Sequence, residues 1–179
     1  LLRNELLEII YSEIKDPGDV ELKRFFDDHH DYFILEGDEY KIWFALFDTE
    51  TEARDFWRKV KEGESFSKLA QETSRTPEFN MGGEAGIVSE GIVEPAVWKE
   101  IGRTVENLGL VKISNPFAVI DGWMCLIVDE EYKQGTVLPF DAVRNEILDM
   151  YIFEKRQDKK DEFIRQLKEK ASIRYGSMQ

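Results

Sequence analysis

The stretch YKIWFALFDTETEARDFWRKVKEG, residues 40–63, decides the class of fold. Its first part, residues 40–47, is apolar nearly throughout, which is typical of a strand that is covered on both faces and central in its sheet. A capping box follows at Thr49–Glu52. The apolar residues of the next helix come at spacings of three and four: Ala53, Phe56, Trp57 and Val60. A buried strand that leads directly into a capped amphipathic helix predicts an α+β domain.

On the C-terminal side of this stretch, short apolar segments alternate with turn-forming residues. A second short helix is predicted by Phe66, Leu69 and Ala70, and a third begins at Glu94-Pro95. An Asp121-Gly122 hairpin turn separates the last strands. The strands expected here are one near 87–88, two short ones at 111–113 and 117–120, and a final one at 123–128.

Helical patterns flank this region on both sides. Residues 1–15 form an amphipathic pattern that ends at Asp16-Pro17-Gly18, and Asp19 is predicted to cap the next helix. From Phe140 the pattern is helical again, and it includes the charged run 154–162, which is typical of a solvated helix face. The order is therefore helices, then a strand–helix module, then helices.

The net charge of −13 and the pI near 4.7 exclude several partners. Phosphate backbones repel such a chain, so we expect no nucleic-acid binding. Docking on anionic membranes is disfavoured for the same reason, and no stretch reaches the roughly 20 apolar residues of a membrane span. Because the chain begins within helical sequence, we expect a fragment whose export signal or lipid anchor lies upstream.

The few metal-binding or nucleophilic residues do not form a recognisable site. The single cysteine, Cys125, lies in an apolar strand and is interpreted as a buried small residue. The two histidines, His29 and His30, are adjacent, so on a helix they point about 100° apart. We therefore predict no metal site and no cofactor.

Several short motifs occur in a fixed order along residues 40–129. Gly63, Phe66, Leu69, Ala70 and Ser74 resemble the Gly-x-x-Phe-x-x-Leu-Ala-x-x-x-Ser pattern of the PpiC/parvulin (rotamase) family. Further matches to that family follow in order: Gly82-Gly83-Glu84-Ala85-Gly86, Ser89-Glu90-Gly91, Glu94-Pro95, Ile113-Ser114-Asn115-Pro116-Phe117 and Gly122-Trp123-Met124. The ordered series covers half the chain, and the helical flanks are similar to extracytoplasmic foldases of the SurA and PrsA type.

The resemblance implies a four-stranded antiparallel parvulin-like sheet surrounded by short helices. It also implies a helical lobe built from the two flanks. We expect an N-terminal helical segment at 1–36, the PpiC domain at 37–132, and a C-terminal segment at 133–179 that packs with the N-terminal helices.

The resemblance also implies where the active site would lie. Parvulins resemble one another in using two histidines, an Asp or Cys, and a hydroxyl beside the prolyl amide. The two histidine positions fall on Phe44 and Met124, the Asp or Cys position on Thr76, and the hydroxyl position on Val119. The apolar cup that holds the proline falls on Val93 and Val97, lined also by Phe44 and Met124. Three of the four polar positions are therefore apolar in this chain.

Rotation of a prolyl bond needs no cofactor, but it needs groups that stabilise the twisted amide. We therefore expect a chaperone or foldase that binds unfolded or proline-containing segments, with weak or lost isomerase activity. Two alternatives stay open: an active peptidyl-prolyl isomerase with a reduced site, and a dimerisation or assembly module. The resemblance implies an extracytoplasmic location, periplasmic or in the cell envelope. Exposed aromatic residues could line a client groove: Phe25, Phe26, Tyr32, Phe33 and Trp98.

Overall fold

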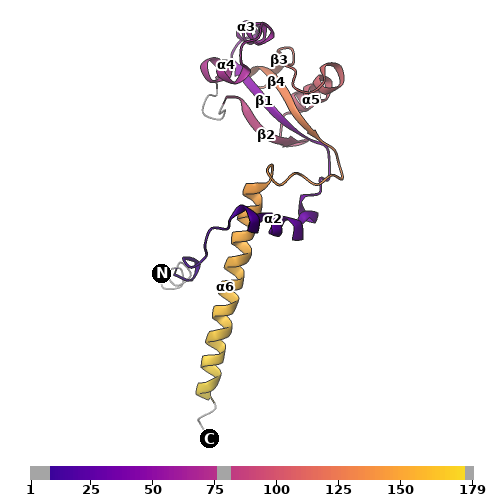
Figure 1. Ribbon diagram of the computed structural model, residues 1–179. Coiled ribbons are helices and arrows are strands. Elements are labelled where there is room, and N and C mark those ends of the chain that lie inside the picture. Colours follow the sequence, from indigo (N-terminus) through magenta and orange to yellow (C-terminus); the bar gives the residue numbers. More distant parts are fainter. Residues whose placement is uncertain (1–8, 76–81, 176–179) are drawn as a thin grey trace. The chain divides into compact units, whose positions relative to one another are not determined.

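The computed structural model describes residues 9–75 and 82–175, with side chains as far as residue 170. The chain divides into two compact units (Figure 1). The sheet unit is Ile34–Val137, and the helical unit comprises the described residues up to Phe33 and from Leu138 onward.

The sheet unit has the α+β fold that the sequence predicts. Its strands form one antiparallel sheet in the order β2-β1-β4-β3, so the apolar strand β1 is central. The elements in chain order are β1 (Glu39–Phe47), α3 (Glu50–Lys61), α4 (Phe66–Thr73), β2 (Glu84–Ser89), α5 (Pro95–Leu108), β3 (Phe117–Val119) and β4 (Gly122–Tyr132). The predicted capping box at the start of α3 is present, since Thr49 Oγ1 accepts from the Glu52 N–H and the Glu52 side chain accepts from the Thr49 N–H.

Alternate residues of the two central strands, β1 and β4, contact helices on opposite faces of the sheet. Both faces of β1 are therefore covered, which explains why its sequence is apolar nearly throughout. One face of the sheet packs against α5, and we refer to it as the α5 face. Its members on β1 and β4 are Tyr40, Ile42, Phe44, Leu46, Met124, Leu126 and Val128. The opposite face packs against α3 and α4, and its members are Trp43, Ala45, Phe47, Trp123, Cys125 and Ile127. Figure 1 shows α3 and α4 on one side of the sheet and α5 on the other.

Two glycines of the family-like motifs are required by close backbone approach. Gly83 has φ +95° and its carbonyl accepts the Phe44 N–H at 2.7 Å, and a Cβ there would lie 2.9 Å from the Phe44 carbonyl oxygen. Gly122 has φ +141° at the β3–β4 turn, where a Cβ would collide with the Phe47 carbonyl oxygen. Both sites combine a conformation that L side chains rarely adopt with a lack of space.

The second half of the sheet unit differs from the prediction in a missing strand and in the length of the final strand. Residues 111–113 do not form a strand, and only Ile113 makes an isolated bridge, to Ile127. The reason is local: Val111 has φ 59°, which interrupts an extended run. The final strand extends four residues beyond the predicted end at 128, because the first residues of β1, from Glu39, pair with its polar end as far as Tyr132.

The helical unit contains α2 (Asp19–Asp28), the short 3-10 helix η1 (His30–Phe33) and α6 (Arg144–Tyr175). As predicted, the C-terminal helix packs with the N-terminal one, around a buried cluster of Leu22, Phe33, Val143, Ile147 and Tyr151. The prediction that Asp19 caps α2 is wrong. Gly18 is the capping residue, and the Asp19 carboxylate instead pairs with Arg144 at 2.7 Å.

Part of the helix predicted over 1–15 lies outside the described residues, and 9–11 are helical. The segment contacts α6 through Glu13, whose carboxylate is 3.0 Å from Lys159 Nζ, and through Tyr11, whose ring lies 5.4 Å from the Arg156 guanidinium. Within residues 9–75 and 82–175, no helix is both long and apolar enough to span a bilayer.

Candidate functional site

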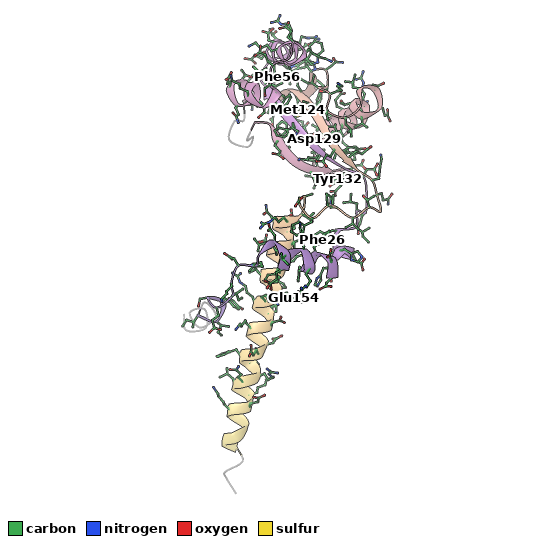
Figure 2. The ribbon with its side chains drawn as sticks, viewed as in Figure 1. Phe26, Phe56, Met124, Asp129, Tyr132 and Glu154 are labelled. Atoms are coloured by element: carbon green, nitrogen blue, oxygen red, sulfur yellow. The ribbon has the colours of Figure 1, made fainter. Side chains whose placement is uncertain are left out.

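The two positions that the resemblance assigns to the family's histidines, Phe44 and Met124, lie on adjacent central strands. Phe44 pairs with Leu126 in the β1–β4 register, and Met124 pairs with Leu46. Phe44 and Met124 are therefore diagonal neighbours on the α5 face, a geometry in which side chains about 7–8 Å apart can interact. Figure 2 labels Met124 within the sheet unit.

The other described candidate residues join the same apolar cluster. Val97 of α5 and Met124 are buried, with exposed fractions of 4% and 8%. Val93, Val119 and Phe44 are half-buried and pack against this cluster. These five positions come from three strands, one helix and the segment before it, and their side chains are all apolar. Thr76 lies outside the described residues.

Two motif serines complete the hydrogen bonding of the central strands beside this cluster. The Ser114 hydroxyl is fully buried and accepts the Leu126 N–H at 3.0 Å, while the Ser114 N–H donates to the Leu126 carbonyl at 2.8 Å. The Ser74 hydroxyl likewise accepts the Leu46 N–H at 3.2 Å. Each serine thus satisfies a buried strand donor where no neighbouring strand does so. The sequence marked both residues as motif members, but a lone serine carries no periodic signal that predicts this role.

The β3–β4 turn next to the cluster is held from two sides. Arg75 donates from Nη1 to the Asp48 carboxylate at 3.0 Å and to the Asp121 carbonyl at 2.5 Å. Glu94, which precedes α5, accepts the Ile120 N–H at 3.0 Å. The turn therefore keeps Val119 at a defined position relative to α5.

The single cysteine is separated from these positions by the sheet. Cys125 is on the face covered by α3 and α4, has no exposed surface, and its thiol contacts the Ala53 carbonyl at 3.5 Å. Burial raises the pKa of the Cys125 thiol to about 12, so the thiolate that acts as a nucleophile is not formed near neutral pH.

The two histidines belong to the helical unit rather than to this cluster. Their Nδ1 atoms lie 2.8 Å from the Phe25 carbonyl for His29 and 2.9 Å from the Asp27 carbonyl for His30. Among the described residues, no three His, Cys, Asp or Glu side chains are grouped so as to hold a metal ion. On the α5 face, Phe44, Val93 and Val119 keep part of their surface exposed and offer apolar contact.

Known proteins resemble this chain over most of its length. A protein of Bacillus subtilis (strain 168), provisionally named as the peptidyl-prolyl cis-trans isomerase YacD, is 28% identical over 151 residues, which are 80% of this chain and 48% of that protein. The foldase protein PrsA of Clostridium acetobutylicum is 22% identical over 174 residues, which are 96% of this chain and 50% of that protein. The chain thus spans about half the length of these two curated relatives.

Among solved structures, the peptidylprolyl isomerase PrsA of Bacillus cereus is similar in fold, with a TM-score of 0.50 and 15% identity over 97% of this chain and 58% of that one. The model of the PPIC-type PPIase domain, a rotamase family, matches residues 17–145, which is more than two thirds of the chain. With the antiparallel sheet, the flanking helices and the ordered motifs, this match establishes that the chain belongs to the PPIC-type peptidyl-prolyl isomerase (parvulin) family.

Proposed function

We propose that this chain is a foldase module that binds unfolded or proline-containing polypeptide segments and has weak or no isomerase activity. One observation carries the proposal: the described positions expected to surround a prolyl amide are apolar and belong to one cluster on the α5 face. The half-buried Phe44, Val93 and Val119 provide a surface for an apolar ring.

The chemistry of prolyl rotation supports the loss of activity. The barrier is roughly 18–20 kcal/mol, and it falls when groups around the amide stabilise the twisted state better than the planar one. A single well-placed hydrogen-bond donor in an active site is worth about 100-fold to 1000-fold in rate. Phe44, Val119 and Met124 supply no such donor. An apolar cluster leaves no buried polar group without a hydrogen-bond partner, so it is compatible with a stable fold.

A kinetic assay on short Xaa-Pro peptides tests the catalytic part of this proposal. We expect kcat/KM to lie at least about 100-fold below that of an active parvulin domain measured in parallel, because apolar residues occupy three positions that are polar in parvulins. Turnover at the rate of the active domain would refute the proposal and favour the active isomerase.

Binding is tested separately with a fluorescent proline-rich peptide. Val119→Asp places a charge at the edge of the cluster and should weaken binding by about tenfold or more. Ala118→Asp is the matched control, because Ala118 is the preceding residue of β3 and is exposed. If both variants bind like the original chain, the α5 face is not the binding site.

The client-binding role has a third test, suppression of aggregation of a chemically unfolded protein. We expect the chain to delay aggregation at a stoichiometric ratio. A stable dimer without any such delay would instead favour the assembly module.

The proposed location is extracytoplasmic, in the periplasm or the cell envelope. It rests on membership of the family together with the similarity to the foldase PrsA. Fractionation of the source cells followed by immunoblotting tests it, and recovery in the cytosolic fraction would contradict it.

A further inference from the structure

We propose that a groove in the helical unit binds polypeptide segments that carry a cationic side chain next to a large apolar one. The inference rests on the proposed polypeptide-binding function and adds a second site with its own side-chain preference. The groove lies between α2 with η1 on one side and α6 on the other, and its volume is about 570 Å³. Figure 2 labels Glu154 on α6, beside α2.

The apolar part of the groove is built from both sides. Phe25 and Tyr32 line it from α2 and η1, and Met150 and Phe153 line it from α6. Tyr32 and Phe153 remain 74% and 65% exposed. Exposed aromatic side chains gathered in a groove indicate an interaction site, and a methionine among them adapts to ligands of different shape. Phe26 and Phe33, by contrast, pack in the helical core.

The aromatic floor of the groove is held in place by neighbouring groups. The Phe25 ring stacks on the His29 ring at 4.1 Å and meets the Tyr151 ring edge-on at 5.5 Å. The His29 ring is also fixed by its Nδ1, 2.8 Å from the Phe25 carbonyl. A floor that is already ordered lowers the entropy cost of binding a flexible segment.

The polar part of the groove is acidic. Asp149 and Glu154 line it together with His29, and none of the described lining residues is Lys or Arg. Glu154 remains 51% exposed, with Oε2 3.9 Å from His29 Nε2. Two cations of the helical unit have partners of their own: Arg144 pairs with Asp19, and Lys155 lies over the Tyr151 ring at 5.2 Å. In a chain with net charge −13, such a site favours a cationic ligand.

The size of the groove favours an extended client segment over a helix of a second copy. A volume of about 570 Å³ accommodates one or two side chains with their backbone, within the range of roughly 300–1,000 Å³ typical of ligand pockets. A packed helix would instead need a long continuous apolar strip. The occupant that we infer is therefore a short segment with Lys or Arg beside Phe or Leu.

Fluorescence anisotropy with a labelled, proline-free synthetic peptide of alternating Lys and Leu or Phe tests the charge preference. Glu154→Lys should weaken binding about fivefold at low salt, and the loss should shrink as salt is added. Glu162→Lys is the matched control, since it makes the same charge change at an exposed position of α6 outside the groove, and it should stay within about twofold. Equal effects of the two variants would overturn the charge preference.

A second variant tests the apolar preference and the location of the site. Phe153→Ser should weaken binding about tenfold. Because Phe153 is exposed, the variant should keep the fold, which circular dichroism checks. Unchanged binding would overturn the assignment of the groove. A peptide with Glu in place of each Lys should bind far more weakly. Equal affinity of the two peptides would overturn the preference for a cationic side chain.

The test separates this inference from the proposed function of the α5 face. Because the Lys-containing peptide lacks proline, Val119→Asp should change its binding by less than Glu154→Lys or Phe153→Ser does. If proline peptides do not bind the sheet unit while this peptide binds with the stated pattern, the groove stands and the role of the α5 face fails. Light scattering that reveals a dimer abolished by Glu154→Lys would show that the groove takes a second copy, which overturns the inference.

Discussion

Removal of one buried hydroxyl, in Ser114→Ala, should destabilise the sheet unit without changing its fold. The Ser114 hydroxyl is the acceptor for the Leu126 N–H at 3.0 Å, and neither residue has any exposed surface. Alanine removes the acceptor and leaves the Leu126 N–H without its partner at a fully buried site. A buried donor left without a partner costs about 1–3 kcal/mol.

The corresponding thermal shift follows from the size of the unit. The sheet unit, Ile34–Val137, has about 100 residues, for which 1 kcal/mol corresponds to roughly 4–8 °C in Tm. A loss of about 2 kcal/mol therefore predicts a decrease of roughly 10 °C. Ser74→Ala should cost less, because its hydrogen bond to the Leu46 N–H is longer, at 3.2 Å, and Ser74 keeps 7% exposure.

Tryptophan fluorescence measures this shift selectively. All four tryptophans of the chain lie in the sheet unit, at positions 43, 57, 98 and 123, so the helical unit does not contribute to the signal. Thr51→Ala removes an exposed hydroxyl from α3 and is the control, with an expected change within about 0.5 kcal/mol. A Tm for Ser114→Ala within about 2 °C of the original chain would refute the reasoning.

Two further predictions concern one residue of each unit. Burial and the hydrogen bond to the Glu21 carboxylate raise the pKa of Tyr151 to about 12, so between about pH 10 and pH 12 this tyrosine ionises in the unfolded chain but stays neutral in the folded one. The stability that Tyr151 contributes is therefore present below about pH 10 and falls over that range. Tyr151→Phe should flatten this fall in melts of the helical unit followed by circular dichroism. An unchanged slope would contradict this. In the sheet unit, Gly122→Ala should lower the free energy of unfolding in urea by about 3 kcal/mol or more, since φ is +141° and a Cβ would collide with the Phe47 carbonyl. Gly102→Ala in α5 is the control; it has open space around it and should be neutral or stabilising. Equal urea midpoints of the two variants would argue against the collision.

Local patterns in the sequence were sufficient for the class of fold and for most of its elements. The unbroken apolar run of β1 reflects helices on both faces of the sheet, and the capping box at Thr49 and Glu52 marks the start of α3. Such features depend on residues within one or two turns of one another, so they can be read before the chain is folded. The end of β4 depended on its pairing with the distant β1, and the missing strand at 111–113 on the φ of Val111, which no sequence pattern reports.

The arrangement of the candidate site was set by the tertiary structure. The motif alignment named Phe44 and Met124, but the β1–β4 register makes them diagonal neighbours, and α5 adds Val97 to the same cluster. The groove of the helical unit depends even more on the tertiary structure, because it brings together Phe25 and Phe153, which are more than a hundred residues apart in the chain. Periodicity determines which face of its own element a side chain occupies. Which faces meet is decided by the burial of apolar surface across the whole chain, and that information is not local.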